Sequence, residues 1–215
     1  MRRFVALLGV WAMGLAWVLG GVAPVSASAQ APVAAAVGAV VVSTPGGLTS
    51  LAPFRLLDTR DGTGAPKAAV GVGEMVHLQV TGEGGVPDSG VSAVVLNVTV
   101  TAPSVAGFLT VFGDETTRPT ASNLNFAKGQ TVPNLVIAPV GANGKVALYN
   151  GSGGSVQVIA DVSGYFLAGA PAASGALGSL APARLLDTRD GTGAPKGAVG
   201  VGEMVHLQVT GEGGV

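Results

Sequence analysis

Residues 91–101 read VSAVVLNVTVT, and this stretch decides the fold. Apolar side chains stand at alternate positions along it, at Val94, Leu96, Val98 and Val100. Successive side chains of a β-strand point to opposite faces, whereas a helix would repeat its apolar positions every three or four residues. The alternation therefore predicts a long strand with one face buried against a core.

Outward from this strand, short segments rich in β-branched residues recur between clusters of Gly, Pro, Asn and Asp, a pattern typical of strands joined by turns. The further expected strands cover residues 51–59, 74–81, 108–112, 122–126, 131–140, 145–150 and 155–166. We therefore expect an all-β fold, an antiparallel β-sandwich of about eight strands in a jelly-roll-like arrangement. A β-barrel is the alternative.

Local features add detail to this expectation. In residues 74–81, Val76, Leu78 and Val80 share one face, and Val156, Val158, Ala160 and Val162 share a face of the last strand. Pro133 and Pro139 place residues 131–140 at a sheet edge or a bulge, because proline cannot donate to a ladder. Asn143-Gly144 predicts a tight hairpin in which residues 145–150 pair back on residues 131–140.

A duplication is the strongest signal of domain organisation. Residues 50–86 and 179–215 match at 35 of 37 positions, at an offset of 129, and differ only at Phe54/Ala183 and Ala68/Gly197. We expect a complete repeat over 50–166, a linker over 167–178 and an incomplete second copy over 179–215. Two strands do not bury a sheet face alone. The chain is therefore expected to be a fragment of a longer repeat protein, or to have a loosely held tail.

The N-terminus has the pattern of an export signal. Two arginines, Arg2 and Arg3, precede the apolar run FVALLGVWAMGLAWVLGG over residues 4–21, and Ala27-Ser28-Ala29 fits a cleavage site. We predict a signal peptide over 1–29 and a secreted or cell-surface product; a retained membrane anchor is the alternative. Residues 30–49 are expected to be a low-complexity linker.

Composition excludes several classes of function. Without Arg2 and Arg3 the chain has nine basic and twelve acidic side chains, so neither nucleic acid nor an anionic membrane is an expected partner. It has no cysteine, which excludes disulfides and thiolate metal sites.

Several long phrases resemble a known repeat: RLLDTRDGTGAP from residue 55, GVSAVVLNVTVTAPSVAGFLTVF from 90, SNLNFAKGQTVPNLV from 122 and VQVIADVSGYF from 156. They are similar to a tandem β-repeat module of secreted actinobacterial proteins, often appended to extracellular hydrolases. The resemblance implies a non-catalytic accessory module on an exported protein.

The residues themselves give little indication of catalysis. Each copy has one histidine, His77 and its equivalent His206, on the polar face of an alternating strand, where we expect it to face solvent. Ser89, Ser104 and Ser122 lack the glycines of a nucleophile elbow. Asp58-Thr59-Arg60 has arginine where aspartic proteases need glycine. We therefore expect no enzyme.

The DTRDGTG turn, residues 58–64, has two interpretations. Asp58 and Asp61, three residues apart beside loop carbonyls, would suit a calcium ion as a bound cofactor. Alternatively, Asp58 caps the turn and pairs with Arg60 or Arg55, while Asp61-Gly62 forms a β-turn. Asp161 is a further partner for an arginine.

Sugar binding is a further candidate function. The predicted mature chain has no tryptophan, so a flat aromatic platform is not expected, but Tyr149 would contribute an aromatic ring, and Asn123 and Asn125 would suit a polar groove. We expect an extracellular module acting as spacer, surface-display or cell-envelope contact element. The alternative is a carbohydrate-binding module that targets a secreted hydrolase to extracellular polysaccharide or peptidoglycan.

Overall fold

The computed structural model describes residues 44–171 and 173–215. The signal peptide predicted for residues 1–29 lies outside them, as does most of the predicted linker over 30–49. Within the described ranges no helix is long and apolar enough to span a membrane.

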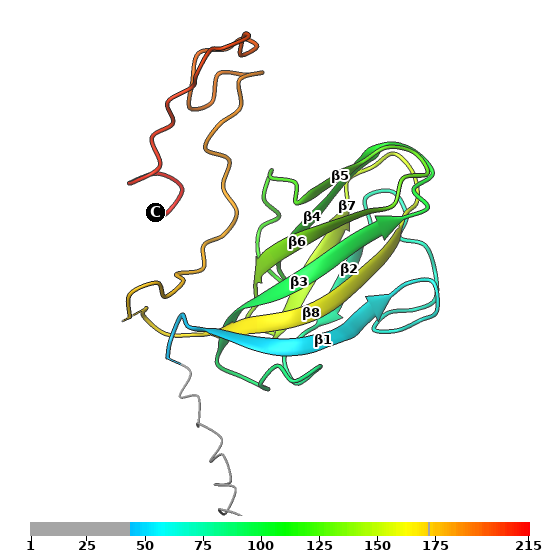
Figure 1. The fold of residues 1–215 in the computed structure, drawn as a ribbon. Helices are drawn as coiled ribbons and strands as arrows, with labels where there is room; N and C mark the ends of the chain where they lie inside the picture. The colour runs from blue at the N-terminus through cyan, green and yellow to red at the C-terminus, as the bar shows by residue number, and fades with distance from the viewer. Residues whose placement is uncertain (1–43, 172) are drawn as a thin grey trace, which may run out of the picture. The chain divides into compact units, whose positions relative to one another are not determined.

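Eight strands form the domain, and each overlaps a strand that the sequence pattern predicts (Figure 1). Their bounds are β1 Leu48–Asp58, β2 Met75–Gln79, β3 Val91–Thr101, β4 Gly107–Gly113, β5 Leu124–Phe126, β6 Val132–Pro139, β7 Lys145–Asn150 and β8 Gln157–Leu167. The first strand begins two residues before the predicted repeat boundary at Ser50.

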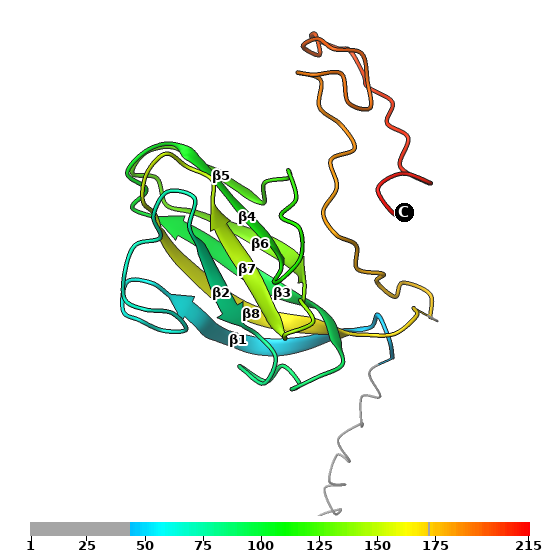
Figure 2. The same cartoon turned by 180° about the vertical axis from the view of Figure 1, so that it is seen from behind.

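The strands make two antiparallel four-stranded sheets, ordered β1-β8-β3-β6 and β2-β7-β4-β5. They pack face to face, as seen from both sides in Figures 1 and 2. The neighbours pair first with last, second with seventh, third with sixth and fourth with fifth, which is the winding of a jelly roll. The predicted all-β sandwich is confirmed.

The core lies between the sheets and uses the predicted faces. All four alternate apolar residues of β3 are fully buried, and so are Val156, Val158, Ala160 and Val162 at the start of and along β8. From the second sheet Leu78, Leu109 and Leu148 close the core. Alternation read from the sequence thus identified the buried sides correctly.

The predicted hairpin between β6 and β7 is wrong. The turn itself exists, because Gly144 has φ +75° and Gly144 N donates to Gly141 O at 2.9 Å. However, β6 pairs with β3, while β7 lies between β2 and β4 in the other sheet. Pro133 and Pro139 confine β6 to the predicted edge, so β7 crosses to the second sheet, where both its edges are paired.

Candidate functional site

The outer face of the β2-β7-β4-β5 sheet carries a cluster of ionisable and hydrogen-bonding side chains. Cross-strand register places Met75 beside Tyr149, and His77 beside Ala147. On the other side of β7, Tyr149 pairs with Thr110 and Ala147 with Phe112. These positions alternate with the core positions of the same strands, so their side chains lie on the opposite face of the sheet. Thr110, Phe112 and Ala147 are buried on that face, whereas Met75 and His77 are exposed.

The segment that follows β4 closes this face into a pocket of about 350 Å³. The side chains that line it are Met75, His77, Phe112, Asp114, Glu115, Thr116, Arg118 and Tyr149. It combines apolar walls with an imidazole, a guanidinium, two carboxylates and a phenol. We call it the tyrosine pocket.

His77 and Asp114 form a polar pair at one side of the pocket. Asp114 is buried, and its Oδ1 lies 2.6 Å from His77 Nδ1, while Asn143 Nδ2 donates to its Oδ2 at 2.9 Å. Burial acts to raise the pKa of the Asp114 carboxyl, but the hydrogen bonds from Asn143 and His77 outweigh it and the pKa is lowered. At neutral pH Asp114 is therefore a charged hydrogen-bond acceptor that links His77 of β2 to Asn143 of the turn before β7.

Arg118 and Tyr149 form the second pair. The Arg118 guanidinium carbon lies 4.0 Å from the centre of the Tyr149 ring, a cation–π contact. Tyr149 was predicted to bind sugar, and the structure places it in the pocket with one ring face covered by Arg118. A ligand would use the guanidinium and the phenol edge, or displace Arg118 from the ring.

The imidazole of His77 is half exposed at 53%, so it faces outward as predicted, but its partner Asp114 was not predicted. A nucleophile beside His77 would complete a catalytic arrangement. Thr116, which lines the same pocket, instead donates its hydroxyl to Gly113 O at 2.6 Å. Within the described residues the pair is thus an acid–base dyad with no hydroxyl hydrogen-bonded to the imidazole.

The two asparagines predicted with Tyr149 lie elsewhere, at β5. Asn123 Oδ1 accepts from Val111 N at 2.7 Å, so its side chain continues the β4–β5 ladder. Asn125 is exposed, and its Oδ1 lies 3.3 Å from Ser122 Oγ. Neither lines the tyrosine pocket, so the structure does not bring the three predicted residues into one cavity.

The DTRDGTG turn is built on Asp58, which is buried. Arg60 donates to it twice from its guanidinium, at 2.8 and 2.6 Å, and once from its backbone N at 3.1 Å. Arg55 Nη1 adds a bond at 3.1 Å, and its Nε bonds Asp161 Oδ1 at 2.8 Å. The local interpretation, with Asp161 as a further partner, is therefore the arrangement found.

Calcium at this turn stays a prediction. Asp61 Oδ1 accepts from Thr63 N at 2.9 Å, and both oxygens of Asp58 accept from arginine. A cation at Asp58 would have to displace guanidinium groups first. Over the described ranges, no group of three or more His, Asp or Glu is placed to hold a metal.

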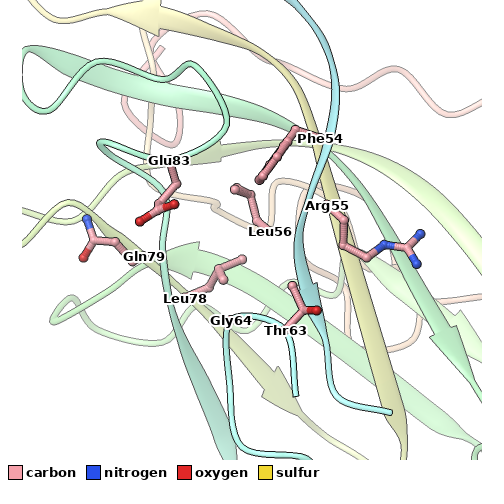
Figure 3. Close-up of a pocket in the computed structure, with 8 residues that line it drawn as sticks. All are labelled: Phe54, Arg55, Leu56, Thr63, Gly64, Leu78, Gln79 and Glu83. Atoms are coloured by element: carbon pink, nitrogen blue, oxygen red, sulfur yellow. The ribbon is translucent and has the colours of Figure 1, made fainter. Parts of the chain in front are cut away.

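A second groove of about 350 Å³ lies between β1 and β2, at an open side of the sandwich (Figure 3). Phe54, Leu56 and Leu78 form its apolar wall. Arg55 points away from it, toward its carboxylate partners, and Gln79 Nε2 donates to Thr81 O at 3.0 Å. Two of its polar side chains are thus committed to the fold, whereas the tyrosine pocket brings together an imidazole, a guanidinium and a phenol and is the better candidate site.

Removing His77 tests the dyad. We expect His77→Ala to lower the free energy of unfolding by about 1 kcal/mol, because buried Asp114 loses one hydrogen bond and keeps that of Asn143. The pKa of the Asp114 carboxyl should rise, which an NMR titration measures. His206→Ala changes the equivalent residue of the second copy and is the matched control. An unchanged pKa in a variant that combines His77→Ala with His206→Ala, so that neither copy supplies the imidazole, would contradict the pairing.

Comparisons with protein-family models, with curated proteins and with solved structures found no match.

Proposed function

We propose that the domain is a non-catalytic display and contact module of an exported protein, acting at the cell envelope. The observation that carries this proposal is where the chain enters and leaves the sandwich. Leu48 of β1 pairs with Phe166 of β8, and Gly46 N donates to Leu167 O at 2.9 Å. Both ends of the domain therefore lie together (Figure 1).

This geometry favours display over spacing. A module whose ends lie at opposite poles lengthens the chain by its full dimension, whereas one with adjacent ends adds little length and projects sideways. Such a module presents its far end away from its two points of attachment. Weak sites presented in this way on several modules would gain by avidity.

The tyrosine pocket supplies the contact chemistry. Its phenol, imidazole, guanidinium and carboxylates offer both donors and acceptors, and its apolar wall of Met75 and Phe112 suits the carbon face of a sugar. A cell-envelope glycan, such as that of peptidoglycan, is the ligand class we propose. The second candidate, targeting of a hydrolase to another polysaccharide, rests on the same pocket.

Sedimentation with insoluble peptidoglycan, chitin and cellulose tests the proposal. We expect the chain to be retained on peptidoglycan and Tyr149→Ala to bind at least tenfold more weakly. Phe54→Ala is the control, because Phe54 is exposed and does not line the tyrosine pocket. This variant should bind as well as the unsubstituted chain. Preference for chitin or cellulose would favour the second candidate, and no retention on any of the three would contradict glycan contact.

The non-catalytic part of the proposal has its own test. Hydrolysis of any of these polymers by the purified chain, lost on His77→Ala, would overturn it. We expect no activity, because the His77–Asp114 dyad has no hydroxyl bonded to it in the described part of the chain.

A further inference from the structure

The segment that is duplicated in the sequence forms one complete side of the sandwich. It contains β2 and all of β1 but its first two residues, and each of these strands is the outermost of its sheet. β1 pairs with β8 and β2 pairs with β7, in both cases antiparallel. We call the β7 and β8 edges that receive them the acceptor edge. Residues 50–86 are thus one removable layer on a body made by β3 to β8.

Residues 179–215 carry the same layer in sequence. The buried apolar side chains that 50–86 gives to the core are identical in the second copy: Leu56, Leu57, Val70, Leu78, Val80 and Val86 correspond to Leu185, Leu186, Val199, Leu207, Val209 and Val215. The two differences, at Phe54 and Ala68, fall on exposed positions. Every core contact of the first copy is therefore available to the second.

The second copy has the local structure of the first but not its strands. Asp187 N donates to Thr192 O at 2.9 Å and Arg189 bonds Asp187, as Arg60 bonds Asp58. No strand is present over 179–215. The turn is encoded locally, whereas strands need partners, and the acceptor edge is already occupied by residues 50–86.

Consequently the apolar side chains of the second copy are less buried than their counterparts in the first. Leu57 is 0% exposed, and its counterpart Leu186 is 38% exposed. Val80 is likewise fully buried, while Val209 is 45% exposed. Burial of such side chains is the main favourable contribution to folding, so the second copy gains by docking on an acceptor edge.

The second copy starts at the right place to do so. Gly46, just before β1, donates its N to Leu167 O at 2.9 Å and accepts from Leu177 N at 2.8 Å. Leu177 is the counterpart of Leu48, which pairs with Phe166. Ten residues, 167–176, separate Phe166 from Leu177, enough for a loop that lets the second copy run back along β8 as an antiparallel strand.

We propose that residues 179–215 are an alternative occupant of the acceptor edge, able to replace residues 50–86 within the same chain. In the exchanged state Arg184 takes the place of Arg55 at Asp161, and His206 that of His77 at Asp114. The first copy is favoured, because Phe54 packs beside Val162 over Gly84, and Ala183 lacks that ring. The duplication thus gives one sandwich body two interchangeable sides.

Paired substitutions in the full chain test the exchange. Leu57→Asp places a charge at a buried site of the first copy, and Leu186→Asp is the matched change in the second. We expect each single variant to keep a β-rich circular dichroism spectrum and a cooperative melt, because the other copy occupies the acceptor edge. The double variant should lose both. If Leu57→Asp alone unfolds as completely as the double variant, or if the double variant stays folded, the proposal is overturned.

A cross-link locates the second copy directly. Arg55 pairs with Asp161 across β1 and β8, so Arg184→Cys with Asp161→Cys reports occupation by the second copy. The chain has no other cysteine. We expect this disulfide to form within one chain and at least tenfold faster once Leu57→Asp displaces the first copy. No acceleration, or a disulfide found only between chains in a dimer, would overturn the exchange within one chain.

Discussion

Replacing Asn150 with alanine is expected to lower the free energy of unfolding by about 3–5 kcal/mol, because it breaks a buried network of hydrogen bonds. Asn150 is 0% exposed at the end of β7. Its Nδ2 donates to the carbonyls of Val70, Gly71 and Gly154 at 3.1, 2.9 and 2.8 Å. Its Oδ1 accepts from Ser152 N at 3.0 Å and Ser152 Oγ at 2.7 Å.

The size of the expected effect follows from what alanine leaves behind. Three carbonyls and a backbone N–H would lose their side-chain partner in a place where water replaces it poorly. The bonds also join two segments far apart in the sequence, around residue 70 and around residue 154, so their loss loosens both. Because Asn150 lies outside the duplicated segment, the second copy offers no replacement.

Urea unfolding followed by circular dichroism measures this effect, with Asn125→Ala as the control. Asn125 is exposed and bonds only Ser122 among the contacts found in the described residues, so we expect a loss below about 0.5 kcal/mol there. Asn150→Asp should be almost as harmful as alanine, since a carboxylate cannot donate to three carbonyls. A loss under about 1 kcal/mol in Asn150→Ala would contradict the network.

The strand positions and buried faces could be predicted because they depend on the chain's local period. Alternation at Val94, Leu96, Val98 and Val100 marks a buried face whatever the partner strand is. The DTRDGTG turn is similarly local, and the same bonds form around Asp58 and Asp187 although only the first belongs to a sandwich. The turn requires glycine at position 64, where φ is +68°. A Cβ at this position would lie only 2.0 Å from Leu56 O.

Strand pairing and the tyrosine pocket could not be predicted, because both depend on contacts between distant residues. An Asn-Gly turn specifies a reversal of the chain, but not whether the next strand stays in the same sheet, so β7 was wrongly paired with β6. Asp114 lies 37 residues from His77, and Arg118 lies 31 from Tyr149. Asp114 was not predicted; its position in a polar turn directly after a strand is the signal that could have pointed to it.

The second large effect is a fall in the free energy of unfolding at acid pH, which we expect because the pKa of the Asp58 carboxyl is lowered in the folded chain. Hydrogen bonds from the Arg60 side chain, opposed by burial and helped by the Arg60 backbone and by charge, lower the pKa of the Asp58 carboxyl from 3.8 to about 2. Since the folded pKa lies below the unfolded one, the stabilisation is fully present above about pH 4 and is lost as the pH falls through about 2.

At neutral pH this carboxylate should contribute about 1–2 kcal/mol, less than the full shift implies, because both arginines are about half exposed to solvent. We expect Asp58→Asn, combined with Asp187→Asn so that neither copy retains the carboxylate, to remove that amount at pH 7. The variant should also be less sensitive than the original chain to acid between pH 4 and 2. Urea unfolding at pH 7, 4, 3 and 2 measures both.

The matched control for this variant is Asp61→Asn with Asp190→Asn. These carboxylates lie in the same turn and accept only from a threonine of the turn in the described structure, so the change should cost less than about 0.5 kcal/mol. Parallel stability curves for the Asp58 variant and the original chain would show that the arginine bonds do not couple folding to pH. A decline confined to the original chain would instead identify Asp58 as the acid-sensitive group, because only its carboxylate joins Arg55 of β1 to Arg60 of the turn.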